Sequence, residues 1–179
     1  MLLPFLWLLT EMPALAENAR LKDIVVTTTR DKLLLYLSVG NCFTKQMINA
    51  IQNGIPTTFT FFIRLIERRD YAWDKKIVDL KVSHTVRYDN LKKEYFIVRT
   101  EKNGQIVSLK DFEEVKQSMS EIVGLKVTRL SNLKRNARYK MEMMAQLDKI
   151  ELPFHLHYVL FFLSLWDFET DWYTVEFQY

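Results

Sequence analysis

The spacing of apolar and polar residues along the chain predicts mostly β-strands. In most segments apolar residues recur at every second position, which is the period of a strand with one buried face. Asn103-Gly104 favours a hairpin turn, because both residues tolerate the positive φ of a type I′ turn. Residues 158–165 are apolar on both sides and predict a buried strand or a short buried helix, with the strand preferred. The other predicted strands cover residues 24–29, 33–39, 57–69, 77–88, 95–99, 139–148 and 173–179.

A first helix is predicted to begin after Thr44 and to end before Gly54. Thr44 can accept backbone N–H bonds as the N-cap, and Phe43 before it can pack against Ile48. Gly54 suits the left-handed position that follows a helix, and Pro56 prevents its continuation. The apolar face of this helix consists of Met47, Ile48 and Ile51.

A second helix is predicted to start at Ser108 and to end at Gly124. Ser108 stands three residues before Asp111, which is close to the spacing of a capping box. The apolar residues of this segment lie at helical spacing and are Leu109, Phe112, Val115, Met119 and Ile122.

Together these elements predict a mainly β (α+β) fold. About eight or nine mostly antiparallel strands with two short helices fit a curved sheet, a sandwich or an open barrel. No internal repeat or linker is visible, so residues 17–179 are expected to form a single β-rich domain.

The N-terminal residues predict export. The apolar run at positions 2–9 is too short to cross a bilayer, which takes about 20 residues. Ala14-Leu15-Ala16 matches a signal-peptidase site, so residues 1–16 are a predicted signal peptide and cleavage is expected before Glu17. No basic residue precedes the apolar run, which leaves an uncleaved anchor or an ordinary buried segment as alternatives. The expected location is the periplasm or another exported compartment.

Charge and cysteine content exclude some classes of function. The chain has 25 Lys and Arg against 22 Asp and Glu, a net charge of +3, which does not indicate a nucleic-acid partner. The one cysteine, Cys42, has no internal disulfide partner and is expected to be a small buried hydrophobic residue.

A basic strand end is most simply a solvated surface, with contact to anionic phospholipid or an acidic partner as the alternative. Its residues are Arg64, Glu67, Arg68, Arg69, Lys75 and Lys76.

His155 and His157 are candidate metal ligands. Two residues apart, they share one face of a strand, and Glu151 or Asp148 could supply a third ligand. The alternative interpretation is two partly exposed histidines near the start of a strand after Pro153. No second cluster of ligands accompanies them, and no cofactor is predicted.

An acidic segment bracketed by two tryptophans is a candidate partner-binding surface. Asp167, Glu169 and Asp171 alternate between Trp166 and Trp172, and three such carboxylates could hold calcium or act as acid and base. The segment lacks the glycine and the terminal glutamate of a calcium loop. A turn with inward aromatic residues and solvated acids is therefore favoured, and the tryptophans suit contact with a protein.

Nucleophilic catalysis has little support in the sequence. There is no Gly-x-Ser-x-Gly elbow and no glycine-rich phosphate loop. Ser83 and His84 are adjacent on a predicted strand, so their side chains point to opposite faces and cannot pair. No catalytic residue is assigned.

Several landmarks follow one another in a characteristic order. Asn53-Gly54-Ile55-Pro56 precedes the long Phe-rich strand, and Trp73 and Tyr88-Asp89-Asn90-Leu91-Lys92-Lys93-Glu94-Tyr95 come after it. Leu147-Asp148-Lys149-Ile150-Glu151-Leu152-Pro153 and Trp166 complete the series. In this order, over about residues 21–172, the chain resembles the bacterial domain-of-unknown-function family 4390. The resemblance implies an exported single-domain protein and supplies no catalytic residues. Some members are encoded near sensor-kinase genes, which makes an envelope signalling partner conceivable.

These features favour a non-catalytic envelope protein that acts as a protein-binding or adaptor module through its sheet edges or residues 166–172. One alternative is a carrier for a lipid or other apolar ligand, since Phe and Met could line a cavity in a curved sheet. The other is a metal-dependent hydrolase that uses His155, His157 and the acids at 167–171. Peripheral membrane contact is a further possible interaction.

Overall fold

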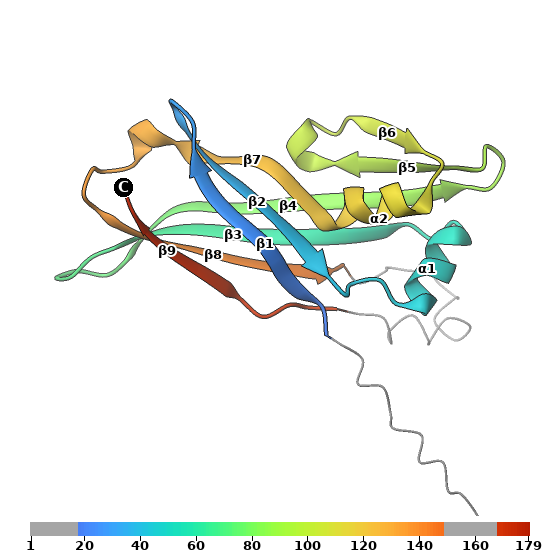
Figure 1. The fold of residues 1–179 in the computed structure, drawn as a ribbon, viewed down its shortest axis with the longest axis horizontal. Helices are drawn as coiled ribbons and strands as arrows, with labels where there is room; N and C mark the ends of the chain where they lie inside the picture. Colours follow the sequence, from blue (N-terminus) through green and yellow to red (C-terminus); the bar gives the residue numbers. More distant parts are fainter. Residues whose placement is uncertain (1–17, 149–167) are drawn as a thin grey trace, which may run out of the picture.

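The computed structural model describes residues 18–148 and 168–179, which form two antiparallel β-sheets (Figure 1). One sheet has the strand order β1-β2-β7 and the other has the order β6-β5-β4-β3-β8-β9. The predicted mainly β class is confirmed, and the sheets do not close into a barrel. The strands are β1 (Arg20–Thr28), β2 (Lys32–Gly40), β3 (Thr57–Arg68), β4 (Lys75–Asp89), β5 (Glu94–Arg99), β6 (Ile106–Leu109), β7 (Glu121–Arg129), β8 (Arg138–Leu147) and β9 (Tyr173–Gln178). The helices are α1 (Lys45–Gln52) and α2 (Phe112–Ser120), with short 3₁₀ turns η1 (Thr100–Lys102) and η2 (Leu130–Asn132).

Strand β3 lies at the centre of the six-stranded sheet. It pairs with β4 from Thr57 opposite Val86 to Glu67 opposite Lys75, and with β8 on its other side. A shift of one residue would turn its apolar face to solvent, so the alternating pattern sets the register. The predicted inward face is confirmed and fully buried, and it consists of Phe59, Phe61, Ile63 and Leu65.

The three-stranded sheet lies across one face of the six-stranded sheet (Figure 1). The predicted hairpin of β1 and β2 is confirmed, with Val26 opposite Leu35. Strand β1 begins earlier than predicted, because Arg20 and Lys22 already pair with β2. The register of this pairing shifts between Lys22 and Val25. Asp23 has a positive φ of 53° there, and such a bulge breaks the period of two that the sequence pattern relies on.

Helix α1 agrees with the sequence analysis at both ends. The Thr44 hydroxyl accepts a hydrogen bond from the Met47 backbone N–H at 3.2 Å, as expected of the N-cap. Gly54 has a φ of 84°, the left-handed conformation expected after the helix. Phe43 packs against Phe59 with ring centroids 5.2 Å apart, and so anchors the start of the helix to the core.

The predicted second helix is wrong at both ends. Asp111 rather than Ser108 is the N-cap of α2, and its carboxylate accepts a bond from the Glu113 N–H at 3.0 Å. Ser108 lies in β6, where its hydroxyl donates to Glu94 at 2.7 Å. An acidic N-cap competes well with a serine, and β6 pairs with β5 before the helix begins.

Strand β7 takes up the end of the predicted helix. Ile122 matches the helical spacing but is buried as a strand residue, paired with Leu37 of β2. Gly124 does not end a helix: it has a φ of 66° where the register of β7 against β2 shifts. This irregularity hides the period of two, which explains why the sequence pattern does not indicate the strand.

The hairpin predicted at Asn103-Gly104 connects β5 to β6. Both residues have positive φ, 56° and 69°, as expected. The connection is longer than a two-residue turn, because Val98 pairs with Ile106 and η1 occupies part of the loop.

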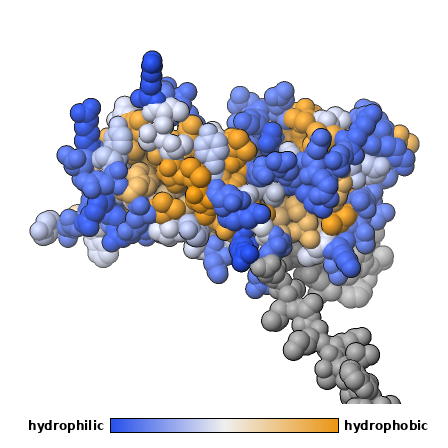
Figure 2. All heavy atoms as spheres, in the orientation of Figure 1, coloured by the Kyte–Doolittle hydropathy of each residue, from blue (hydrophilic) through white to orange (hydrophobic). Residues whose placement is uncertain are grey.

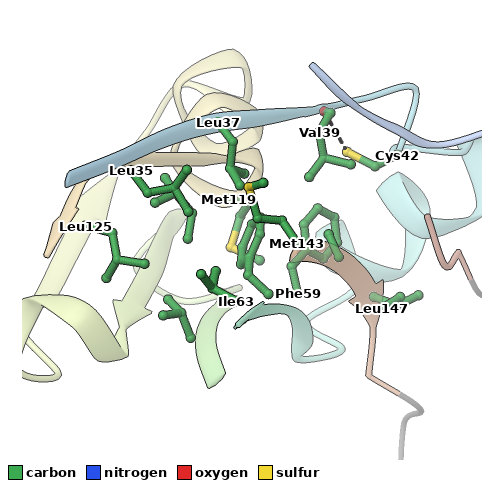
Figure 3. Close-up of a cluster of buried hydrophobic side chains, with 14 of the residues drawn as sticks. Leu35, Leu37, Val39, Cys42, Phe59, Ile63, Met119, Leu125, Met143 and Leu147 are labelled. Carbon is green, nitrogen blue, oxygen red and sulfur yellow. Dashed lines mark hydrogen bonds between the residues drawn. The ribbon is translucent and has the colours of Figure 1, made fainter. Parts of the chain in front are cut away.

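Apolar side chains from both sheets and both helices form one contiguous core, part of which Figure 3 shows. Leu35 and Leu37 of β2 face Ile63 of β3 and Met143 of β8, and Met119 of α2 closes the space between them. Cys42 is buried, as predicted, and its Sγ donates to the Val39 carbonyl at 3.4 Å. Burial raises the pKa of this thiol to about 12, so it is inert at neutral pH.

Two predicted segments lie outside the described residues, namely the signal peptide at 1–16 and the apolar stretch at 158–165. The closing strand at 173–179 is confirmed as β9, which pairs with β8. Among the described residues, no helix is long and apolar enough to cross a membrane.

We expect Phe59→Ala to lower the free energy of unfolding by about 3–5 kcal/mol, because it removes a fully buried ring and leaves a cavity. Urea unfolding measures this loss. Leu91→Ala is the control, since Leu91 is 95% exposed and its removal should change stability by no more than about 0.5 kcal/mol. Equal losses in the two variants would contradict the packing described.

Candidate functional site

The turn between β3 and β4 presents two large aromatic side chains to solvent. These two long strands form a hairpin whose end extends beyond the neighbouring strands in Figure 1. Tyr71 is fully exposed and Trp73 is 95% exposed. Folded proteins bury most of the surface of a tryptophan, so an exposed pair is informative. We call residues 70–74 the hairpin tip and treat it as the candidate contact surface.

Ionic contacts connect the hairpin tip to the strands beside it. Arg68 Nε lies 3.3 Å from Asp74 Oδ2, and the Arg69 backbone N–H donates to Asp74 Oδ1 at 3.2 Å. Arg138 of β8 forms an ion pair with Asp70. These contacts cross the turn and connect it to the neighbouring strand, so the two aromatic side chains stand on an ordered support.

A buried carboxylate supports the base of the hairpin. Glu67 accepts a hydrogen bond from Lys134 Nζ at 2.8 Å, and Arg69 Nε lies 3.4 Å away. The Lys134 hydrogen bond holds the pKa of Glu67 below its ordinary value, against the opposing effect of burial. The loop between η2 and β8 is thereby fastened to β3.

The basic strand end predicted from sequence lies along this hairpin, and most of its cations have acidic partners. Lys76 Nζ lies 2.5 Å from Asp79, and Arg64 Nε lies 3.8 Å from the same carboxylate. Arg68 also contacts Glu176 at 3.1 Å. The exposed aromatic side chains, rather than an excess of positive charge, therefore distinguish this surface.

The described part of the tryptophan-bracketed segment runs along β8. Phe168 packs edge-on against Phe59 at 4.9 Å, while Glu169 and Asp171 are exposed. Trp172 is 41% exposed, and the Arg64 guanidinium lies over its ring, 4.3 Å from the centroid. The structure thus brings together one residue of the predicted basic strand end and one of the predicted partner-binding segment.

Most of the candidate metal ligands lie in a part of the chain that the structure does not describe. His155, His157 and Glu151 lie outside the described residues, as do Trp166 and Asp167 of the acidic segment. Asp148 is described, and its backbone N–H donates to the Thr58 carbonyl at 2.9 Å. Within residues 18–148 and 168–179, no group of three His, Cys, Asp or Glu side chains could hold a metal ion.

A buried ionisable pair connects β4 to η1. His84 Nε2 lies 3.2 Å from Glu101 Oε1, and His84 Nδ1 lies 3.1 Å from the Met119 carbonyl oxygen. Both ring nitrogens thus lie near oxygen atoms, and the contact of Nδ1 with the Met119 carbonyl has the geometry of a hydrogen bond. Ser83 contacts the Thr60 hydroxyl at 3.2 Å on the opposite face, as the sequence predicts.

The pKa of Glu101 lies below its ordinary value. Burial alone would raise the pKa, but the contact with His84, together with Arg99 at 4.0 Å, favours the charged carboxylate and outweighs it. The pair joins three elements of the fold. His84 is fully buried, while Glu101 also lines an open hollow of about 410 Å³ between β4, η1 and β7.

Sequence reasoning missed two of these features. Tyr71 and Trp73 lie between the predicted strands 57–69 and 77–88, and such a position is itself a signal of exposure, because connecting residues lie beyond the sheet. Glu101 has no such signal. It meets His84 only because β5 pairs with β4, with Arg99 opposite His84, and η1 then bends back toward it.

The fold and the hairpin tip define a two-sheet antiparallel β-protein with a projecting aromatic turn. Residues 16–176 match the family described as Domain of unknown function (DUF4390), so the chain belongs to this family and the resemblance is confirmed. No curated protein and no solved structure matches the chain.

We expect Glu101→Gln to lower the free energy of unfolding by about 1–3 kcal/mol at pH 7, because it removes the charge opposite His84. The pKa of Glu101 is lower in the folded protein than in the unfolded chain, so its charged form stabilises the fold. This contribution is fully present above the unfolded pKa and is lost as the pH falls through the folded pKa. The difference from the natural chain should therefore shrink below about pH 4.

Urea unfolding at pH 7 and at about pH 3.5 measures this dependence. Glu114→Gln is the control, because Glu114 is an exposed carboxylate of α2. A difference that is the same at both pH values would show that the charge of Glu101 does not stabilise the fold.

Proposed function

We propose that this chain is a non-catalytic protein-binding module of the cell envelope, which contacts a protein partner through the hairpin tip. The observation that carries the proposal is the full exposure of Tyr71 and Trp73 on a braced turn. Tryptophan and tyrosine contribute much of the binding energy in protein interfaces, where each fills a desolvated pocket. The partner is expected to offer an apolar pocket with a polar rim.

The rigidity of the support strengthens this proposal. Association costs conformational entropy when loops become ordered, and an already ordered turn avoids that cost. Asp70 and Asp74 are both engaged within the molecule, through Arg138 and Arg68. The aromatic side chains are therefore the groups of the hairpin tip that remain free to bind.

The tryptophan-bracketed segment is a second candidate contact for the same partner. Trp172 is partly exposed, and the sequence motivates Trp166, Asp167, Glu169 and Asp171 beside it. The carrier alternative needs an apolar cavity. The buried apolar side chains of the described residues instead form one contiguous cluster, which supports a binding module more than a carrier. No specific observation supports the hydrolase alternative.

We expect Trp73→Ala to weaken partner binding about 30-fold or more, and Tyr71→Ala to weaken it to a smaller extent. A photo-crosslinking amino acid in place of Ala72 should give a discrete crosslinked protein in intact cells, and its mass identifies the partner. Binding is then measured with purified partner and the alanine variants, whose folding is checked by thermal unfolding.

Leu91 supplies the matched control, because it is equally exposed in the turn at the other end of β4. A crosslinker at Leu91 should not capture the same protein, and Leu91→Ala should bind as the natural chain does. Equal capture from both turns, or binding to vesicles without any crosslinked protein, would refute the proposal. Trp172→Ala in the same assay tests the second contact.

The envelope location rests on the apolar run and on Ala14-Leu15-Ala16. Protein purified from its own cells is expected to have an intact mass that begins at Glu17. A mass that begins at Met1 in the membrane fraction would indicate a retained anchor, and one in the cytoplasmic fraction would refute export.

A further inference from the structure

A second feature at the same end of the molecule is an arginine-lined hollow. Its volume is about 490 Å³, within the range of small-ligand sites, and it is open to solvent. The β1–β2 turn, the end of β7, η2 and the end of the chain surround it, and all lie at the end from which the hairpin tip extends (Figure 1). Its lining residues are Arg30, Asp31, Arg129, Leu130, Ser131, Leu133, Arg135 and Tyr179.

The three arginines of this hollow differ from most others in the described residues. Several arginines elsewhere are paired, as Arg68 is with Asp74, Arg69 with Glu67 and Arg138 with Asp70. In residues 18–148 and 168–179, the structure shows no salt bridge to any hollow arginine, namely Arg30, Arg129 and Arg135. Three cations gathered around a single acidic side chain, Asp31, repel one another, and a bound anion relieves that repulsion.

The walls of the hollow are held together by the fold. The Leu130 backbone N–H donates to the Asp31 carbonyl at 2.9 Å, which joins η2 to the β1–β2 turn. Leu133 is buried below, and its N–H donates to the Leu130 carbonyl at 3.0 Å. The Tyr179 N–H donates to the Ala137 carbonyl at 3.2 Å and ties the end of β9 to the same loop. The arginines therefore extend from fixed backbone.

We propose that this hollow binds a phosphate group, carried either by a soluble phosphorylated compound or by a lipid head group. Guanidinium groups bind phosphate oxygens bidentately, a geometry that a lysine ammonium does not offer. The three arginines of the hollow outnumber its one acidic side chain, Asp31, which favours an anionic ligand. Ser131 and Tyr179 add hydroxyl groups that can donate to further phosphate oxygens.

The test is isothermal titration calorimetry of the full chain with inorganic pyrophosphate, at low and at physiological salt. We expect saturable binding at one site per chain. Each of Arg30→Lys, Arg129→Lys and Arg135→Lys keeps the charge but removes the planar fork, and each should weaken binding about tenfold. Asp31→Asn removes the opposing charge and should tighten binding several-fold.

Arg87→Gln is the matched control, since it removes an exposed arginine of β4 that lies outside the hollow. It should leave pyrophosphate binding unchanged. Trp73→Ala should also leave it unchanged, so failure at the hollow is distinguishable from failure of the proposed protein contact.

A second arm identifies the source of the phosphate. The chain is sedimented with phosphatidylcholine vesicles that either contain or lack phosphatidic acid, whose head group is a phosphate monoester. Binding of pyrophosphate alone supports a soluble ligand, and binding to phosphatidic acid that the arginine variants lose supports a lipid head group. Absence of binding in both arms, or binding that survives all three arginine substitutions, overturns the proposal.

Discussion

The burial of one face of β3 is the constraint on which the rest of the structure depends. This strand pairs with β4 and β8, so its register sets the position of both neighbours. Its inward residues are fully buried against β2, α2 and β8, and a one-residue slip would expose all of them. Strand β4 pairs with β3 as far as Lys75. The turn between the two strands therefore lies beyond the core, at the end of a paired hairpin.

The two ends of the molecule differ in what they present to solvent. At one end, α1 and the β4–β5 turn close the core. The other end carries the β1–β2 turn and η2, and the β3–β4 turn projects from it separately (Figure 1). Figure 2 shows hydrophilic residues toward both ends of this face and apolar residues over its middle. Buried Glu67, which binds Lys134, connects the hairpin to the loop beside the arginine-lined hollow. The hairpin tip and the hollow are therefore connected features at one end of the molecule.

The sequence pattern predicted the fold well where alternation was regular. It identified β2, β3, β8 and β9, and both ends of α1, because their burial follows a period of two or a clear capping pattern. It failed at α2 and β7, where Ile122 fits a helical spacing as well as a buried strand position and Gly124 bends the strand. The basic strand end and Trp172 were identified as separate features, and their contact through Arg64 depends on the pairing of β8 with β3 and β9.

The sequence alone determined the class of fold, the family, and the burial of Cys42, because each depends on local pattern or on the order of motifs along the chain. Tertiary structure decided which charged side chains meet. Glu101 reaches His84, and Arg30, Arg129 and Arg135 line one hollow, because strand pairing joins residues far apart in sequence. It also decided that Tyr71 and Trp73 stand exposed, since no element within residues 18–148 and 168–179 packs over the end of the hairpin. The local pattern of apolar and polar residues indicates which side chains are buried, whereas contacts between residues far apart in sequence depend on strand register and topology.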